Sequence, residues 1–217
     1  MKPKLLGLIL FLVCLSTISL IRSYSKGQIA RTLSPSENRL RWNAEIAKQE
    51  GKGSVTIPTM MFDYPGSANS IDIDQALATY TVVVAQPVER RTYELTSNDL
   101  ITWYKFRIIE SLSKQKSPAC PSCDTASAPA EFLPLKPDEF LLAKNGGQLV
   151  IDGVEIQQVE RDFPQYEEGK KYLLLLSMYP SGVATTAGGP LGVFLVNGDS
   201  NLSPINDRHH LLKDGLK

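Results

Sequence analysis

The chain has 217 residues, with 23 basic and 23 acidic side chains that give a formal net charge of zero. This length suits one domain behind a leader, and a balanced charge without a basic run argues against a nucleic-acid partner. Only two histidines and three cysteines are present, so acid–base, metal and thiol chemistry are restricted to very few positions.

The first 25 residues predict export. A basic head with Lys2 and Lys4 precedes the uncharged apolar stretch Leu5–Ile21, whose most apolar part has the length of a signal peptide, about 7–15 residues. The alternative is an uncleaved N-terminal membrane anchor. In both cases the remainder is expected in the periplasm, at the cell surface or in the secreted space, and it would contact the membrane only through residues 1–25 if these are retained.

Residues 26–53 are predicted to be a helical linker segment. Ser34 followed by Pro35 is typical of a helix start, because a capping residue precedes a proline in the first turn. Leu40, Ala44 and Ala47 recur on one face, and Gly51 is a natural stop.

Residues 54–205 are predicted to form a single β-rich domain, followed by a polar tail at 206–217. A short helix at 72–78 is expected before the main strands, and Pro87 is expected to end the strand that begins near Thr79. Asp152-Gly153 predicts a tight hairpin. The four leucines Leu173–Leu176 indicate a central strand buried on both faces. The remaining expected strands cover 53–57, 100–112, 148–151, 154–158 and 191–196.

Together these elements predict a mainly β fold, a small antiparallel barrel or sandwich with an OB-like barrel as one arrangement. One or two short helices precede it. No helix-length segments alternate with the strands, so a parallel α/β fold is not expected.

A loop rich in Ser, Pro, Ala and Lys spans residues 113–137 and contains Cys120 and Cys123. Once the leader and its Cys14 are removed, these are the only cysteines of an exported chain, so a disulfide that ties the loop is expected. The alternative is an exported thiol–disulfide oxidoreductase that uses Cys120 and Cys123.

No other site chemistry is predicted. The sequence holds no nucleophile elbow, phosphate loop, dinucleotide fingerprint or zinc-protease motif. Zinc would have to recruit His209 and His210 from the polar tail, which is a poor ligand arrangement. We therefore expect no catalytic residues, no cofactor and no metal, and a protein that is not an enzyme.

Five segments carry a resemblance to known proteins. Their letters are ALATYTVVVAQPV, ITWYKFRIIESL, GGQLVIDGVEI, EEGKKYLLLL and GGPLGVF. In this order they resemble a family of uncharacterised exported bacterial proteins, over about Asp72 to Val196, and more loosely the OB-type barrels of netrin-like domains. The resemblance implies a β-rich exported domain and no particular activity. The expected function is a non-catalytic module of the cell envelope or secreted space that binds a protein or other surface through its loops.

Overall fold

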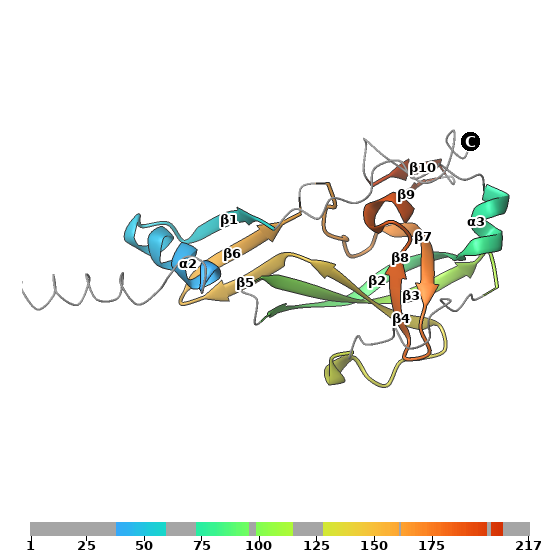
Figure 1. Ribbon diagram of the computed structural model, residues 1–217, viewed down its shortest axis with the longest axis horizontal. Helices are drawn as coiled ribbons and strands as arrows, with labels where there is room; N and C mark the ends of the chain where they lie inside the picture. The colour runs from blue at the N-terminus through green and yellow to red at the C-terminus, as the bar shows by residue number, and fades with distance from the viewer. Residues whose placement is uncertain are drawn as a thin grey trace, which may run out of the picture.

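The computed structural model describes residues 38–59, 73–95, 99–114, 128–160, 162–198 and 201–205. The leader, the first part of the segment 26–53 and the polar tail therefore lie outside the described residues. Within the described ranges the chain forms a β-barrel and a smaller lobe at one end of it (Figure 1).

Five strands form the barrel: β2 (Thr81–Glu94), β3 (Leu100–Ser111), β4 (Glu139–Asn145), β7 (Lys171–Met178) and β8 (Val183–Thr186). Their order is β7-β2-β3-β4-β8, and a further β7–β8 pairing closes the ring. All neighbours are antiparallel except β4 and β8, which run parallel. The predicted mainly β barrel is confirmed.

The barrel has the strand order of an OB-type fold. Its first strand pairs with the second and the fourth, and its third strand runs parallel to its fifth. Aromatic and aliphatic side chains fill the interior, among them Tyr104, Phe106, Phe140 and Leu174.

The leucine strand β7 is buried on both faces, as the sequence predicts. Leu174 and Leu176 point into the barrel, whereas Leu173 and Leu175 pack outside it. The outer layer consists of α3 (Ile73–Thr79) and η3 (Gly189–Gly192). Because consecutive side chains of a strand alternate between faces, this double burial requires four apolar residues in a row.

Two further strands extend the sheet beyond the ring. The first half of β7 pairs with β9 (Val193–Asn197), and β9 pairs in turn with β10 (Asn201–Pro204). The expected pairing of the leucine strand with the segment 191–196 is therefore present, two residues shorter at its start because η3 precedes it.

The lobe consists of α2 (Arg39–Gln49) and a sheet of three strands, β1 (Ser54–Pro58), β6 (Val154–Val159) and β5 (Gly147–Ile151). The β5–β6 hairpin turns at Asp152 and Gly153, both with positive φ, as their type I′ signal predicts. In contrast, β1 runs parallel to β6.

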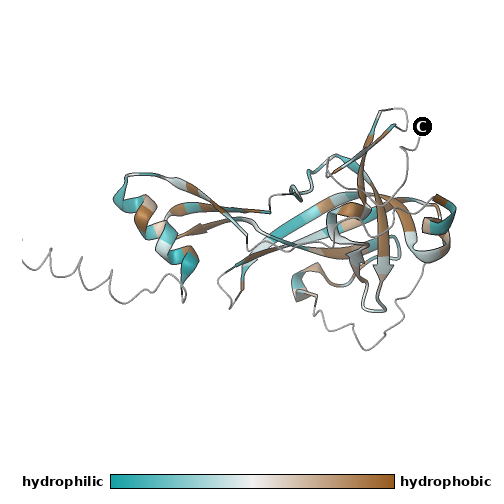
Figure 2. Cartoon of the chain, turned by 45° about the horizontal axis from the view of Figure 1, so that its top comes forward, coloured by the Kyte–Doolittle hydropathy of each residue, from teal (hydrophilic) through white to brown (hydrophobic). Residues whose placement is uncertain are grey.

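The segment 26–53 contributes α2 to this lobe. Leu40, Ala44 and Ala47 are at most 2% exposed and pack against the β1–β6–β5 sheet and Leu100. Figure 2 shows the apolar residues concentrated in the barrel strands and on part of α2. The helix therefore belongs to a packed core.

Two features of the barrel differ from the sequence prediction. The strand β2 does not end at Pro87 but continues to Glu94. Pro87 lies beyond the last residue of β2 that pairs with β7, which is Ala85. On its other side, Pro87 lies at a register shift between β2 and β3. Proline has no N–H, and neither ladder requires one at this position. The strands β4, β8 and β10 were not predicted.

No helix within the described ranges is long and apolar enough to cross a membrane.

Candidate functional site

A cavity of about 320 Å³ lies between the barrel and the lobe. Small-molecule sites have volumes of about 300–1,000 Å³ and occur preferentially at such boundaries. Its lining comes from the barrel strands β2 and β3, the lobe strands β5 and β6, and the connection between β6 and β7. The lining residues are Arg90, Arg91, Thr92, Thr102, Tyr104, Gly147, Gln148, Gln157, Gln158, Val159 and Gln165.

One wall of the cavity is made where β5 crosses the end of the β2–β3 hairpin. Thr102 Oγ1 donates a hydrogen bond of 2.7 Å to the Gly146 carbonyl, so the Thr92 hydroxyl, 2.9 Å from Thr102 Oγ1, is the donor of their shared bond. A Cβ at Gly147 would overlap both threonines. Glycine at 147 is therefore what lets the lobe approach the barrel at this point.

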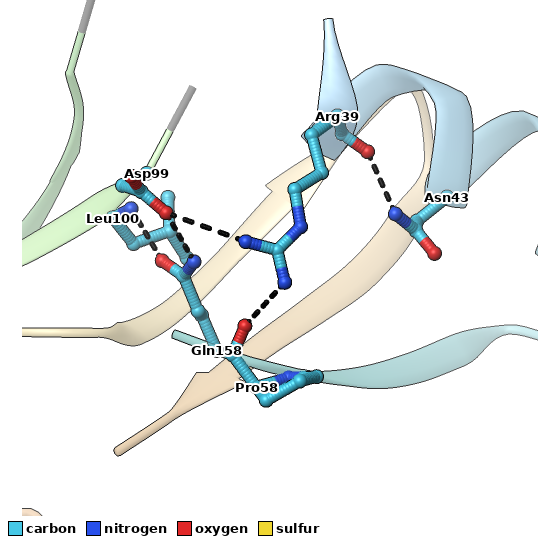
Figure 3. A network of polar contacts seen from close by, with 6 residues as sticks. All are labelled: Arg39, Asn43, Pro58, Asp99, Leu100 and Gln158. Atoms are coloured by element: carbon cyan, nitrogen blue, oxygen red, sulfur yellow. Dashed lines mark hydrogen bonds and ion pairs between the residues drawn. The ribbon is translucent and has the colours of Figure 1, made fainter. Parts of the chain in front are cut away.

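A second wall is fixed by Gln158, which is fully buried. Its Oε1 accepts a 2.6 Å hydrogen bond from the Leu100 N–H, and its Nε2 donates a 2.6 Å bond to Asp99 Oδ1. Arg39 joins α2 to this network through the Pro58 carbonyl at 2.5 Å and Asp99 at 3.8 Å (Figure 3). Because its carbonyl and amino groups both have partners, Gln158 is a rigid structural element of the cavity.

A third wall is formed by Arg90, Tyr104 and Gln165. Arg90 stands directly opposite Tyr104 in the β2–β3 register, and directly opposed residues share one face of a sheet. The Tyr104 hydroxyl donates to Gln165 Oε1. Burial raises the pKa of Tyr104 to about 12, against the positive charge of Arg90 and hydrogen bonds from Arg90 and the Tyr166 backbone. The phenol is therefore a neutral donor at physiological pH.

The orientation of the Gln165 amide follows from this arrangement. Since the Tyr104 oxygen accepts hydrogen bonds from Arg90 and Tyr166, its proton is directed to the amide oxygen of Gln165. Gln165 Nε2 is then a buried donor, with no hydrogen-bond partner among the described residues. A buried donor without a partner costs about 1–3 kcal/mol, which marks this side chain for a functional explanation.

The second arginine on the cavity rim is already engaged elsewhere. Arg91 lies opposite Trp103, on the other face of β2. Its guanidinium contacts Glu89 Oε1 at 3.1 Å and lies 5.9 Å from the centre of the Phe132 ring. Arg90 shares the inner face of the β2–β3 pair with Tyr104, to which it donates a hydrogen bond, and it has a further long contact of 3.9 Å to the exposed Glu168.

A buried ion pair lies beside one cavity residue, since Lys144 stands opposite Thr102 in the β3–β4 register. Lys144 Nζ is 3.0 Å from Glu160 Oε2, and both side chains are at most 5% exposed. The ammonium also lies 4.4 Å from the centre of the Phe163 ring. Burial lowers the pKa of Lys144, although the Glu160 carboxylate opposes the shift. This lysine balances an internal charge and does not line the cavity.

The face on which OB-type barrels usually bind oligonucleotides or oligosaccharides is covered in this protein. It corresponds to the outer face of β3 and β4, where Trp103, Leu141 and Phe132 form a buried cluster. Phe132 comes from η2 (Ala130–Phe132), in the second half of the loop predicted at 113–137. Trp103 is only 7% exposed under this cover, so it is not available to stack on a base or a sugar.

The predicted disulfide residues Cys120 and Cys123 lie outside the described residues, as do His209 and His210. In the part of the chain that the structure describes, no group of three or more His, Cys, Asp or Glu side chains is placed to hold a metal ion. The disulfide therefore stays a prediction.

Sequence reasoning did not find the cavity residues. Tyr104 lies within the strand predicted at 100–112, but Arg90 follows Pro87, where the preceding strand is expected to end. Gln165 lies in a connection without a periodic pattern. The one usable signal was Gly146-Gly147, whose paired glycines indicate a close backbone approach.

No family model, no curated protein and no solved structure matches this chain. The resemblance to exported bacterial proteins therefore stays an expectation.

Proposed function

We propose that this protein is an exported, non-catalytic binding module whose ligand enters the cavity between the barrel and the lobe. The observation that carries the proposal is the cavity itself, a space of about 320 Å³ walled by strands of the barrel and of the lobe. Export is inferred from the leader-like sequence of residues 1–25.

The chemistry of the lining supports binding. Among the described residues that line the cavity, none is His, Cys, Asp or Glu, the types that most often transfer protons or attack substrates. Gln148 and Gln157 are exposed at its rim, where amide groups can hydrogen-bond a ligand without changing charge. Such a set of groups is suited to hydrogen-bonding a ligand.

The surroundings of the cavity support the same proposal. Its Thr92–Thr102 wall and its Gln158 wall are held by hydrogen bonds within the protein. A site preorganised in this way loses little conformational entropy on binding. The alternative OB-type surface on β3 and β4 is filled by Phe132, so a ligand does not find an open face there.

Two tryptophan substitutions in β5 test the proposal. Gln148→Trp places a large side chain on the cavity rim, whereas Val150→Trp adds the same bulk two residues along the strand, at a position that is 67% exposed and outside the lining. The full chain is purified without dialysis from the cells that produce it and examined by native mass spectrometry.

We expect a bound mass on the wild-type protein and on Val150→Trp, and its loss from Gln148→Trp. A bound mass that survives equally on Gln148→Trp, or no bound mass on any of the three proteins, would contradict the proposal.

A further inference from the structure

We infer that the cavity selects a ligand with a single carboxylate group, held between the Arg90 guanidinium and the amide of Gln165. This inference rests on the proposed function, since it names the chemical class of the ligand for the same site. It follows from the groups that remain unsatisfied once the structural hydrogen bonds of the cavity are accounted for.

The polar groups of two cavity walls already have partners inside the protein. Gln158 forms hydrogen bonds with Leu100 and Asp99, and Thr102 forms one with Gly146. Arg91 forms an ion pair with Glu89 on the opposite face of β2. None of these groups needs a ligand.

The groups left over on the inner wall are hydrogen-bond donors. Gln165 Nε2 is buried without a partner among the described residues, and its orientation is fixed by the Tyr104 hydroxyl. Arg90 has five N–H donors, of which Tyr104 and Glu168 engage only a part, and it faces the same space. Two neighbouring donor groups, one of them charged, match a ligand oxygen that only accepts hydrogen bonds.

The charge of the site selects among such ligands. Arg90 and Arg91 are the cations among the described lining residues, and none of these residues is negatively charged. Because Arg91 is paired with Glu89, the charge of Arg90 is the one that a ligand would meet. A monoanion balances this charge. A phosphate dianion would bring excess negative charge close to Glu168, which lies 3.9 Å from Arg90. A planar carboxylate also matches the fork of a guanidinium in two parallel hydrogen bonds.

The test compares matched pairs of probes that differ in one carboxylate. Glucuronate is compared with glucose, and N-acetylglycine with N-acetylglycinamide, so that a sugar acid and a peptide-type carboxylate form separate arms. Inorganic phosphate forms a third arm. Binding to the full chain is followed in ¹H–¹⁵N spectra through the side-chain NH₂ signals of Gln165, which are assigned by their loss in Gln165→Leu.

We expect at least one carboxylate probe to shift the Gln165 NH₂ signals and its neutral partner to leave them in place. Arg90→Gln should weaken that binding by about tenfold or more, because a charge-assisted hydrogen bond is lost. Arg107→Gln is the matched control, since Arg107 on β3 has the same 50% side-chain exposure as Arg90 but does not line the cavity.

Gln165→Glu provides a second variant. Its own carboxylate would lie beside Arg90, so we expect it to fold with an unchanged melting temperature at neutral pH and to lose binding of the carboxylate probe. Equal shifts from charged and neutral probes, a response to phosphate alone, no response to any carboxylate up to tens of millimolar, or unchanged binding by Arg90→Gln would each overturn the inference.

The two proposals fail in different ways. If Gln148→Trp loses a bound mass that wild type carries while the carboxylate probes produce no shift, the cavity is a ligand site for another chemical class. If Gln148→Trp keeps the bound mass, the proposed function itself is wrong.

Discussion

The phenol of Tyr104 links the protonation state of the cavity wall to the stability of the fold. Its pKa is raised to about 12, above the ordinary tyrosine value near 10, chiefly because the side chain is buried. The neutral phenol is therefore favoured in the folded protein. Stability from this group is complete below pH 10 and is lost as the pH rises from 10 to 12, since the unfolded chain releases the proton first.

Tyr104→Phe should remove this part of the alkaline sensitivity. Between pH 10 and pH 12, we expect the free energy of unfolding of the wild type to fall by about 2 kcal/mol more than that of the variant. Urea unfolding measured across this interval gives the comparison. The pKa of Tyr172 is also raised by burial. Because Tyr172 is present in both proteins, its contribution to the pH dependence cancels in the comparison. Parallel pH profiles for the two proteins would show that Tyr104 does not carry the effect.

Lys144 shows where prediction from single residues fails. In its strand the inward positions hold Phe140, Leu142 and then Lys144. A lysine at the end of an apolar alternation normally predicts that the strand has reached solvent. Here Glu160, from a different substructure, supplies the compensating charge, and no local pattern contains that information. The same is true of Arg90 and Gln165, which are 75 residues apart and meet only in the folded protein.

At the scale of elements, the crossing of β5 over the β2–β3 hairpin depends on Gly147. Its φ is +144°, and a Cβ there would overlap Thr102 and Thr92. Gly153, in the turn of the β5–β6 hairpin, also has a positive φ of +82° but has no neighbour within 4 Å of the position of a Cβ. An alanine at Gly153 would therefore add backbone strain alone, whereas an alanine at Gly147 would add both strain and steric overlap.

Gly147→Ala should lower the free energy of unfolding by about 2–4 kcal/mol, because the β5 crossing has to move away from the threonines. Gly153→Ala should cost only about 1 kcal/mol, from strain at positive φ. Denaturant unfolding of both variants at neutral pH measures the difference. Equal costs would mean that the close approach at Gly147 contributes nothing to stability.

The sequence predicted the elements whose signals are local. The leucine strand β7 and the type I′ turn at Asp152-Gly153 are recognisable from their own residues, and both are present. The strand β8 has four residues and β10 also has four, too few for a period to emerge. The extension of β2 past Pro87 depends on where β7 leaves it, which only the tertiary structure determines.

At the scale of the whole molecule, the barrel is required for the lobe. The lobe strand β1 precedes all barrel strands in the sequence, whereas β5 and β6 lie between the barrel strands β4 and β7. Leu100, at the start of the barrel strand β3, lies in the core of the lobe. Loss of the barrel therefore removes the support on which the lobe assembles.

Leu174→Asp should unfold both parts together. The leucine is fully buried in the barrel, and an unpaired carboxylate there costs more than about 4 kcal/mol. We expect loss of hydrogen-exchange protection in β1 and β6 as well as in β7. Leu112→Asp, at a position that is 42% exposed, is the matched control and should keep protection throughout. Protection that persists in the lobe of Leu174→Asp would show that the lobe is stable without the barrel.

The parallel pairing of β1 with β6 also determines the order in which the chain can become structured during synthesis. Ser54 pairs with Glu155, so the ribosome adds about 100 residues between the two strands, which takes on the order of 5–20 s at bacterial or eukaryotic rates. For that time α2 and β1 have no partner sheet, although they are among the first segments made. Among the paired strands of the described chain, β1 therefore waits longest after its own synthesis for its partner, longer than β2 waits for β7.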